Sequence, residues 1–243
     1  MKDLLFSLFM AFGGVVHAQS LSWNSISVYG GPALPLCKFA SENTINSGAG
    51  LARRGYTFSL DSDWKSKGPI GLKTNLRYQS FGISTQFYLD FLAPIKQTGE
   101  IYRLNSGQWN AWSFHMGPAM KFKLEKKLSF APYIVLGLQS LSKARFYFGS
   151  DDTNSFIEQS SGSGLTFSWC LGGNLIHFFN DKVSILTGID LQKADGKIKN
   201  ITTKASSTFR QLIGTTDRSF SALHLNIGMI VNLTDNIEKT DGR

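Results

Sequence analysis

The stretch Leu223–Leu233, with the sequence LHLNIGMIVNL, alternates strictly between two kinds of side chain. Its odd-numbered positions are all leucine, isoleucine, methionine or valine, whereas its even-numbered positions include His224, Asn226 and Asn232. Alternation with a period of two over this length predicts a β-strand with one apolar and one polar face. The same pattern recurs along the chain and predicts the fold.

Seven earlier segments alternate in the same way, so the sequence predicts eight strands in all. The others are Ser25–Leu36, Ala52–Trp64, Pro69–Gln79, Ala111–Leu124, Leu128–Leu141, Gly164–Phe179 and Lys182–Gln192. Their connections alternate between long and short, and the faces assigned outward carry no Asp, Glu, Lys or Arg. Short turns on one side, longer loops on the other and an uncharged outer face are typical of barrels that span an outer membrane.

Residues 1–18 have the pattern of a secretory signal peptide. Lys2 precedes the apolar run Leu4–Val16, and small residues at Val16 and Ala18 predict cleavage near Ala18. The alternative, a first transmembrane helix, is disfavoured because the run is shorter than the about 20 residues that a bilayer requires. We expect a signal peptide at 1–18, a barrel at 19–233 and a polar periplasmic tail at 234–243.

The expected location is the outer membrane of a Gram-negative bacterium, and the expected fold is all-β, an eight-stranded antiparallel up-and-down transmembrane β-barrel. Charged residues make up only 17% of the chain, against about 25% in soluble proteins. Aromatic side chains near the strand ends predict two interfacial girdles: Tyr56, Trp64, Tyr78, Trp112, Phe122, Phe130, Phe167, Phe179 and Phe220. The alternative is a soluble barrel or sandwich with the two faces exchanged.

The segments Tyr29–Pro35 and Ala52–Tyr56 resemble the first two strands of the small outer-membrane "porin family" barrels of the OmpA/OmpX type. The chain departs from that pattern at Cys37, where these barrels usually have glycine, and it continues beyond Leu233. The pattern formed by Asn226, Gly228, Val231 and Leu233 is similar to the terminal-strand signal that barrel-assembly machinery reads. The resemblance implies a location and an architecture, with that machinery as a partner, and it implies no activity.

An eight-stranded barrel has an interior that side chains can fill. The inward faces are expected to carry a lumen charge network of Asp61, Asp63, Lys73, Arg77, Lys121, Lys123 and Asp190. Because buried charges must be paired, this network predicts a plugged interior, with Arg77 paired to Asp61 on the neighbouring strand. The alternative is a narrow pore for small solutes or ions.

We expect the protein not to be an enzyme, because His115, His177 and His224 form no recognisable Ser/His/acid arrangement. A lipid-modifying enzyme and a protein-export accessory barrel remain alternatives. No metal spacing or phosphate loop is present, so no cofactor is expected. The predicted function is a structural or interaction role carried by the extracellular loops.

The net charge of +8 suggests anionic lipid headgroups as partners rather than nucleic acid. Within the loop Lys193–Arg218, six basic residues oppose two acidic ones. This loop could bind phosphates of lipopolysaccharide or simply be solvated. The aromatic segment Phe87–Phe91 is either a contact site for a protein partner or a self-packed hairpin.

Overall fold

The computed structural model describes residues 22–41, 51–65, 70–84, 102–143, 145–150, 155–205 and 212–233. Three predictions lie outside these residues: the signal peptide, the polar tail 234–243 and the partner segment Phe87–Phe91.

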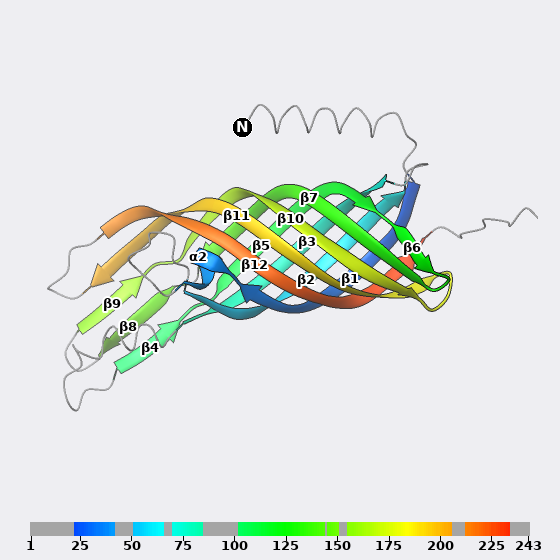
Figure 1. The fold of residues 1–243 in the computed structure, drawn as a ribbon. Coiled ribbons are helices and arrows are strands. Elements are labelled where there is room, and N and C mark those ends of the chain that lie inside the picture. The colour runs from blue at the N-terminus through cyan, green and yellow to red at the C-terminus, as the bar shows by residue number, and fades with distance from the viewer. Residues whose placement is uncertain are drawn as a thin grey trace, which may run out of the picture.

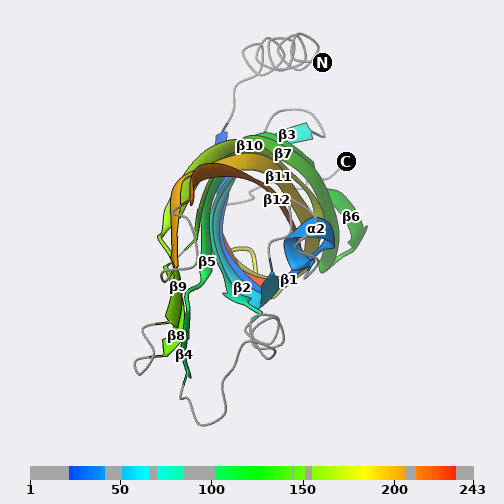
Figure 2. The same ribbon diagram turned by 90° about the vertical axis from the view of Figure 1, so that its left-hand side faces the viewer.

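Eight long strands form a closed antiparallel barrel (Figures 1 and 2). In pairing order they are β10 (Gly162–Phe178), β7 (Leu128–Lys143), β5 (Trp109–Met120), β3 (Ile70–Ile83), β2 (Ala52–Lys65), β1 (Ser22–Pro35), β12 (Leu212–Asn232) and β11 (Val183–Ala205). The pairing of β10 with β11 closes the ring. The predicted eight-stranded up-and-down barrel is therefore confirmed.

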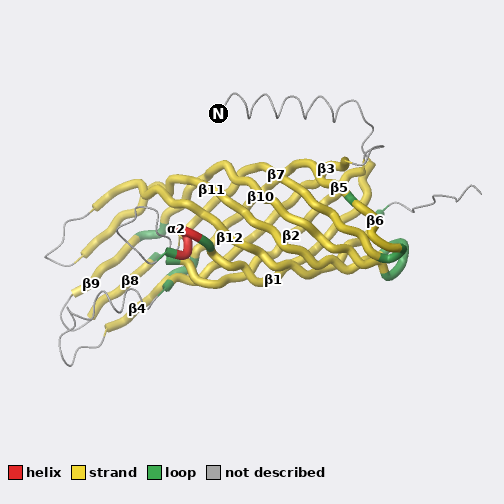
Figure 3. The backbone as a smooth tube through the Cα atoms, in the orientation of Figure 1, coloured by secondary structure: helices red, strands yellow, loops and turns green. Residues whose placement is uncertain are grey.

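The two ends of the barrel differ. The turns at Lys126–Lys127 and at 179–182 mark one end, which we call the turn end. The opposite end, which we call the loop end, carries the long connections and the short helix α2 (Cys37–Ala40). Figure 3 shows the barrel strands running obliquely between these two ends.

Four short strands add to the eight. β6 (Phe122–Glu125) continues the line of β5 and pairs with β7 at the turn end. At the loop end, β9 (Ser155–Gln159), β8 (Phe146–Ser150) and β4 (Tyr102–Ser106) continue the sheet from β11 and project beyond the barrel (Figure 1). These three strands lie outside the eight segments that the sequence predicted, and they pair with one another in the order β9, β8 and β4.

The predicted loop Lys193–Arg218 is corrected. β11 and β12 continue as a paired hairpin from the register pair Lys193 and Ser221 to the pair Thr203 and Leu212. Alternating polar residues in this stretch provide no lipid-facing apolar stripe, so the pattern that identified the other strands is missing. Antiparallel pairing beyond the apolar belt needs no such stripe.

The outer surface of the barrel is apolar, as the alternation predicted. On β12, Leu225, Ile227, Met229 and Val231 point outward and are exposed, whereas His224 is fully buried in the lumen. Among the described residues, no helix is long and apolar enough to cross a membrane.

The loop end of the lumen is filled by apolar side chains, which we call the loop-end plug. Its largest members are Phe39 on α2, Phe81, Trp109, Ile198 and Phe220. The Phe39 ring centroid lies 4.8 Å from that of Phe220, 5.2 Å from that of Phe81 and 5.8 Å from that of Trp109. Helix α2 therefore docks in the mouth of the barrel through one aromatic side chain.

Candidate functional site

The polar side chains of the lumen come from the inward-facing positions of every barrel strand. On β3 these positions are Lys73, Asn75, Arg77 and Gln79, all buried. They follow one another with the period of two that the pleat imposes. Each therefore meets a different level of the barrel interior between the turn end and the loop-end plug.

Arg77 and Asp190 form the centre of the lumen. Two guanidinium nitrogens of Arg77 donate to the two carboxylate oxygens of Asp190, at 2.6 and 2.9 Å. The Nε of Arg77 donates to Ser59 at 2.9 Å. Both charged side chains are completely buried. A bidentate pair of this kind fixes the orientation of both groups as well as compensating their charges.

Asp190 is also bonded to side chains of β7 and β12. It accepts hydrogen bonds from Asn226 at 2.7 Å and from the hydroxyl of Tyr133 at 3.1 Å. The Nδ1 of His224 lies 2.7 Å from the carboxylate, and its Nε2 lies 2.8 Å from Gln79. β12 is the sheet neighbour of β11, whereas β3 and β7 are not, so the Asp190 carboxylate joins its own strand to one neighbour and to two strands further round the barrel.

A layer of glutamine side chains adjoins this pair on the side of the loop-end plug. Gln79 donates to Gln192 at 2.9 Å, and Gln192 donates to Gln139 at 2.8 Å. All three are completely buried. We call the side chains around Arg77, Asp190, His224 and these glutamines the central network.

A second ionic group lies nearer the turn end. The ammonium of Lys73 lies 2.5 Å from a carboxylate oxygen of Asp61 and 3.3 Å from one of Asp63. Asp61 also accepts hydrogen bonds from Tyr29, at 2.9 Å, and from Asn75. The weaker contact of Arg77 with the Tyr29 hydroxyl, at 3.5 Å, links this group to the central network.

The structure differs from the sequence prediction in the pairing of these charges. Arg77 pairs with Asp190 rather than with Asp61, and Asp61 pairs with Lys73. In the register of β2 and β3, Ser59 lies opposite Arg77. Asp61 is two positions further along β2, so its carboxylate lies one level nearer the turn end. Asp190 reaches Arg77 across the lumen, a contact that neighbouring strands do not reveal.

Lys121 and Lys123 are placed apart from the buried charges. Both are exposed and line an open cavity at the turn end. The Lys121 ammonium lies 4.8 Å from the centroid of the Phe178 ring. These two lysines therefore face inward without entering the central network, which corrects the expectation that they would meet its carboxylates.

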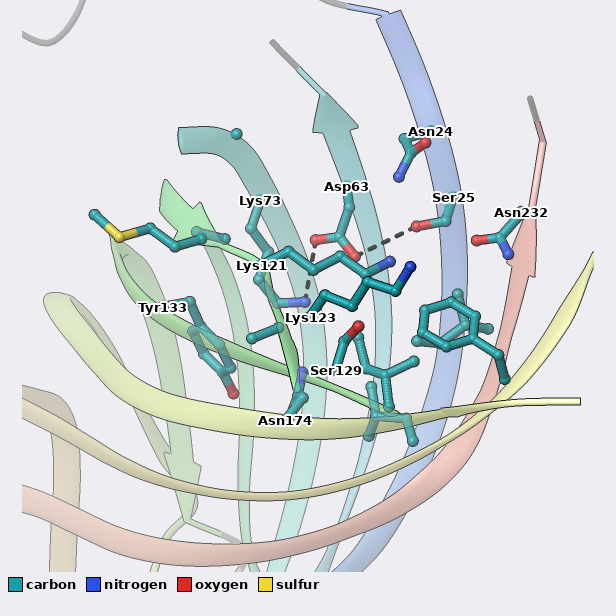
Figure 4. Close-up of a pocket in the computed structure, with 18 of the residues that line it drawn as sticks. Asn24, Ser25, Asp63, Lys73, Lys121, Lys123, Ser129, Tyr133, Asn174 and Asn232 are labelled. Atoms are coloured by element: carbon teal, nitrogen blue, oxygen red, sulfur yellow. Dashed lines mark hydrogen bonds and ion pairs between the residues drawn. The ribbon is translucent and has the colours of Figure 1, made fainter. Parts of the chain in front are cut away.

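That cavity, which we call the turn-end cavity, has a volume of about 710 Å³. Lysines 121, 123, 126 and 127 line one side of it, and Tyr133 and Asn174 lie deeper. Figure 4 shows Lys121 and Lys123 extending across the cavity, and its dashed lines mark the hydrogen bonds that Lys73 and Ser25 donate to Asp63.

One buried group has the residue types of a nucleophilic site. The Nε2 of His115 lies 2.7 Å from the Ser168 hydroxyl, and its Nδ1 lies 3.4 Å from the Asn75 amide oxygen. All three side chains are at least 98% buried. None of them lines the turn-end cavity. His177 faces outward near the turn end, with its ring centroid 5.4 Å from that of Phe179.

The predicted aromatic girdles fall at two levels of the outer surface. Tyr56, Tyr78, Trp112 and Phe167 lie toward the loop end, and neighbouring rings of the first three stand 6.2 and 4.9 Å apart. Trp64, Phe122, Phe130 and Phe179 lie toward the turn end.

Phe220 is the exception, because it is only 1% exposed and belongs to the loop-end plug. Phe220 is at an even-numbered position of β12, like Ala222 and His224, so strict alternation would have placed its side chain in the lumen.

The four residues of the expected assembly signal divide between the two faces of β12. Asn226 is buried in the lumen, Gly228 is half-buried, and Val231 and Leu233 are exposed on the outside.

Several lumen residues were not singled out from the sequence, among them Tyr29, Gln79, Tyr133, Gln139 and Gln192. All lie at inward positions of strands that the sequence identified. The alternation along each strand could have identified them as inward-facing, but no local sequence pattern indicates that they join one network.

A closed strand ring, an apolar outer belt and a charged, polar interior occur together in this chain. The fold is that of a transmembrane β-barrel. In such a barrel every backbone amide of the ring is paired, which a lipid environment requires.

The barrel is similar to several solved outer-membrane proteins. Neisserial surface protein A is 10% identical, with a TM-score of 0.46, and the match covers 87% of this chain and 98% of that one. A major outer-membrane protein of Thermus thermophilus is 11% identical, with a TM-score of 0.48 over 86% and 99% of the chains. Ail, the attachment invasion locus protein of Yersinia pestis, is 12% identical, with a TM-score of 0.39 over 86% and 99%.

No protein-family model matches the sequence, and no curated protein matches it.

Proposed function

We propose that this chain is a sealed, non-enzymatic β-barrel of a Gram-negative outer membrane, acting through the surfaces at its loop end. The observation that carries the proposal is the double closure of the lumen. The Arg77–Asp190 pair and its partners fill the centre, and the loop-end plug fills the mouth. A barrel whose interior is packed with bonded side chains offers solutes no path and leaves its outer surfaces to interact.

More of the described strands project beyond the barrel at the loop end than at the turn end. The strands β4, β8 and β9 and the long β11–β12 hairpin all project there. In this proposal the loop end faces the cell exterior, because outer-membrane barrels place their longer connections outside.

Lipid phosphate is the proposed first contact of that surface. Lys193 and Lys197 are exposed on the outward side of β11, close to where the headgroups of the outer leaflet would lie. Each basic residue near an anionic membrane surface contributes about 1 kcal/mol of attraction. A protein partner at Phe87–Phe91 and delivery by barrel-assembly machinery belong to the same proposal.

The purified barrel is expected to give no single-channel current in a planar bilayer. The reason is that the described side chains of the central network and the loop-end plug are packed in the lumen. The measurement is conductance at increasing voltage, with a large porin, whose lumen is open, inserted into the same membrane as a positive control. Discrete current steps from the purified chain would contradict the sealed barrel and favour the narrow pore.

Placing a charge on the outer belt tests the membrane location. Ile227 is 64% exposed at the middle of the outward stripe of β12, so Ile227→Arg is expected to lower the free energy of unfolding in lipid by about 2–4 kcal/mol. Leu124, 56% exposed beside the turn end, provides the matched control, with an expected loss of about 0–1 kcal/mol for Leu124→Arg. Equal losses at both sites in lipid vesicles would argue against a membrane-spanning belt.

A further inference from the structure

We propose that the turn-end cavity binds a phosphate-bearing ligand, either a free oligophosphate or the headgroup of an anionic phospholipid. This inference does not depend on the loop-end role proposed above, because it concerns the opposite end of the barrel.

The charge of the cavity is strongly positive on one side. The hairpin formed by β6, β7 and their turn supplies lysines 123, 126 and 127 to its wall, and Lys121 lies directly before β6. Only two acidic residues, Asp63 and Asp181, line the cavity among the described residues. Asp63 is already bonded to Lys73 at 3.3 Å, so it compensates little of the hairpin's charge. Clustered ammonium groups in a concave site attract anions, and lysine binds phosphate as a point charge.

The deeper wall has a polar atom without a partner. Asn174 is 2% exposed, and its amide oxygen has no hydrogen-bond partner among the described residues. Buried polar atoms in folded proteins are nearly always bonded. This oxygen is itself covered by neighbouring atoms, so the Asn174 side chain must turn toward the cavity before its amide can bond a ligand there.

The rest of the wall defines the ligand more closely. Ile176, Leu186 and Ile230 belong to one apolar cluster and line the cavity together with Tyr133. The volume of about 710 Å³ falls within the roughly 300–1,000 Å³ of small-molecule sites. The cavity therefore suits a phosphate group joined to a compact organic group, such as the glycerol of a phospholipid headgroup.

Titration calorimetry of the whole barrel, refolded in an uncharged detergent, tests the proposal. The probes are tripolyphosphate and glycerophosphoglycerol, the soluble headgroup of phosphatidylglycerol. The expected result is saturable binding of at least one probe at one site per barrel. The double variant Lys123→Gln with Lys126→Gln is expected to weaken that binding by tenfold or more.

The matched control removes the same charge elsewhere. Lys38 and Arg54 are exposed at the loop end and lie outside the lining of the cavity, so Lys38→Gln with Arg54→Gln should leave affinity within twofold. The heat-dependent gel shift of each variant verifies folding. Absence of saturable binding to both probes, or equal weakening by the two double variants, would overturn the proposal.

The two sources of phosphate are separated in lipid nanodiscs at 0.15 M salt, where screening limits the effect of surface charge. If tripolyphosphate binds the barrel in phosphatidylcholine nanodiscs but not in phosphatidylglycerol nanodiscs, the lipid headgroup is the occupant. Binding that persists in both lipids identifies a free phosphate compound.

Discussion

Asp190→Asn is expected to lower the free energy of unfolding by about 3–5 kcal/mol, the effect of removing one partner from a buried ion pair. The substitution keeps the shape of the side chain but leaves the Arg77 guanidinium in the lumen without its counter-charge. The hydrogen bonds from Asn226 and Tyr133 also lose a charged acceptor. The measurement is the urea midpoint of the gel mobility shift between folded and unfolded barrel.

Asp195→Asn is the matched control, because Asp195 lies on the same strand but is exposed. It is expected to change the free energy of unfolding by less than about 0.5 kcal/mol. The double variant Asp190→Asn with Arg77→Gln should lose less than the sum of its single changes, since it buries no uncompensated charge. A loss for Asp190→Asn no larger than that for Asp195→Asn would show that the central network contributes nothing to stability.

Phe39→Ala is expected to be as destabilising, at about 3–5 kcal/mol, because it leaves a cavity among packed aromatic rings. Phe39 is the residue that anchors α2 in the mouth of the barrel, in contact with Phe81, Trp109 and Phe220. Its loss should also expose Trp109, which is now 1% exposed. The measurements are the urea midpoint and the quenching of tryptophan fluorescence by iodide.

Phe39→Leu is the control for this second prediction. It keeps an apolar side chain of similar reach, so the expected loss is about half as large and quenching should stay near that of the unsubstituted chain. If Phe39→Ala and Phe39→Leu were both indistinguishable from the original chain, the loop-end plug would not depend on α2.

The sequence predicted the barrel because its signal is local. Alternation along a strand records which side chains meet lipid and which meet the lumen, and this assigned the faces of Leu225 and His224 correctly. The same alternation fails beyond the membrane, where both faces of a strand are solvated. The β11–β12 extension and the strands β4, β8 and β9 were therefore missed.

The pairing inside the lumen could not be predicted for a different reason. Arg77 and Asp190 are 113 positions apart in sequence, and their strands are not neighbours in the sheet. Their contact depends on the diameter of the closed barrel and on the level at which each residue enters it. Only the register of all eight strands determines both.

The pairing of β1 with β12 has a consequence for how the order of the strands along the chain could be changed. The amide of Leu233 donates to the carbonyl of Asn24 at 2.9 Å, so the first and last strands begin and end beside each other at the turn end. Circular permutation should therefore be tolerated. A short glycine-rich linker from residue 233 to residue 24, with new termini opened at the turn Lys126–Lys127, would preserve every strand pair of the ring.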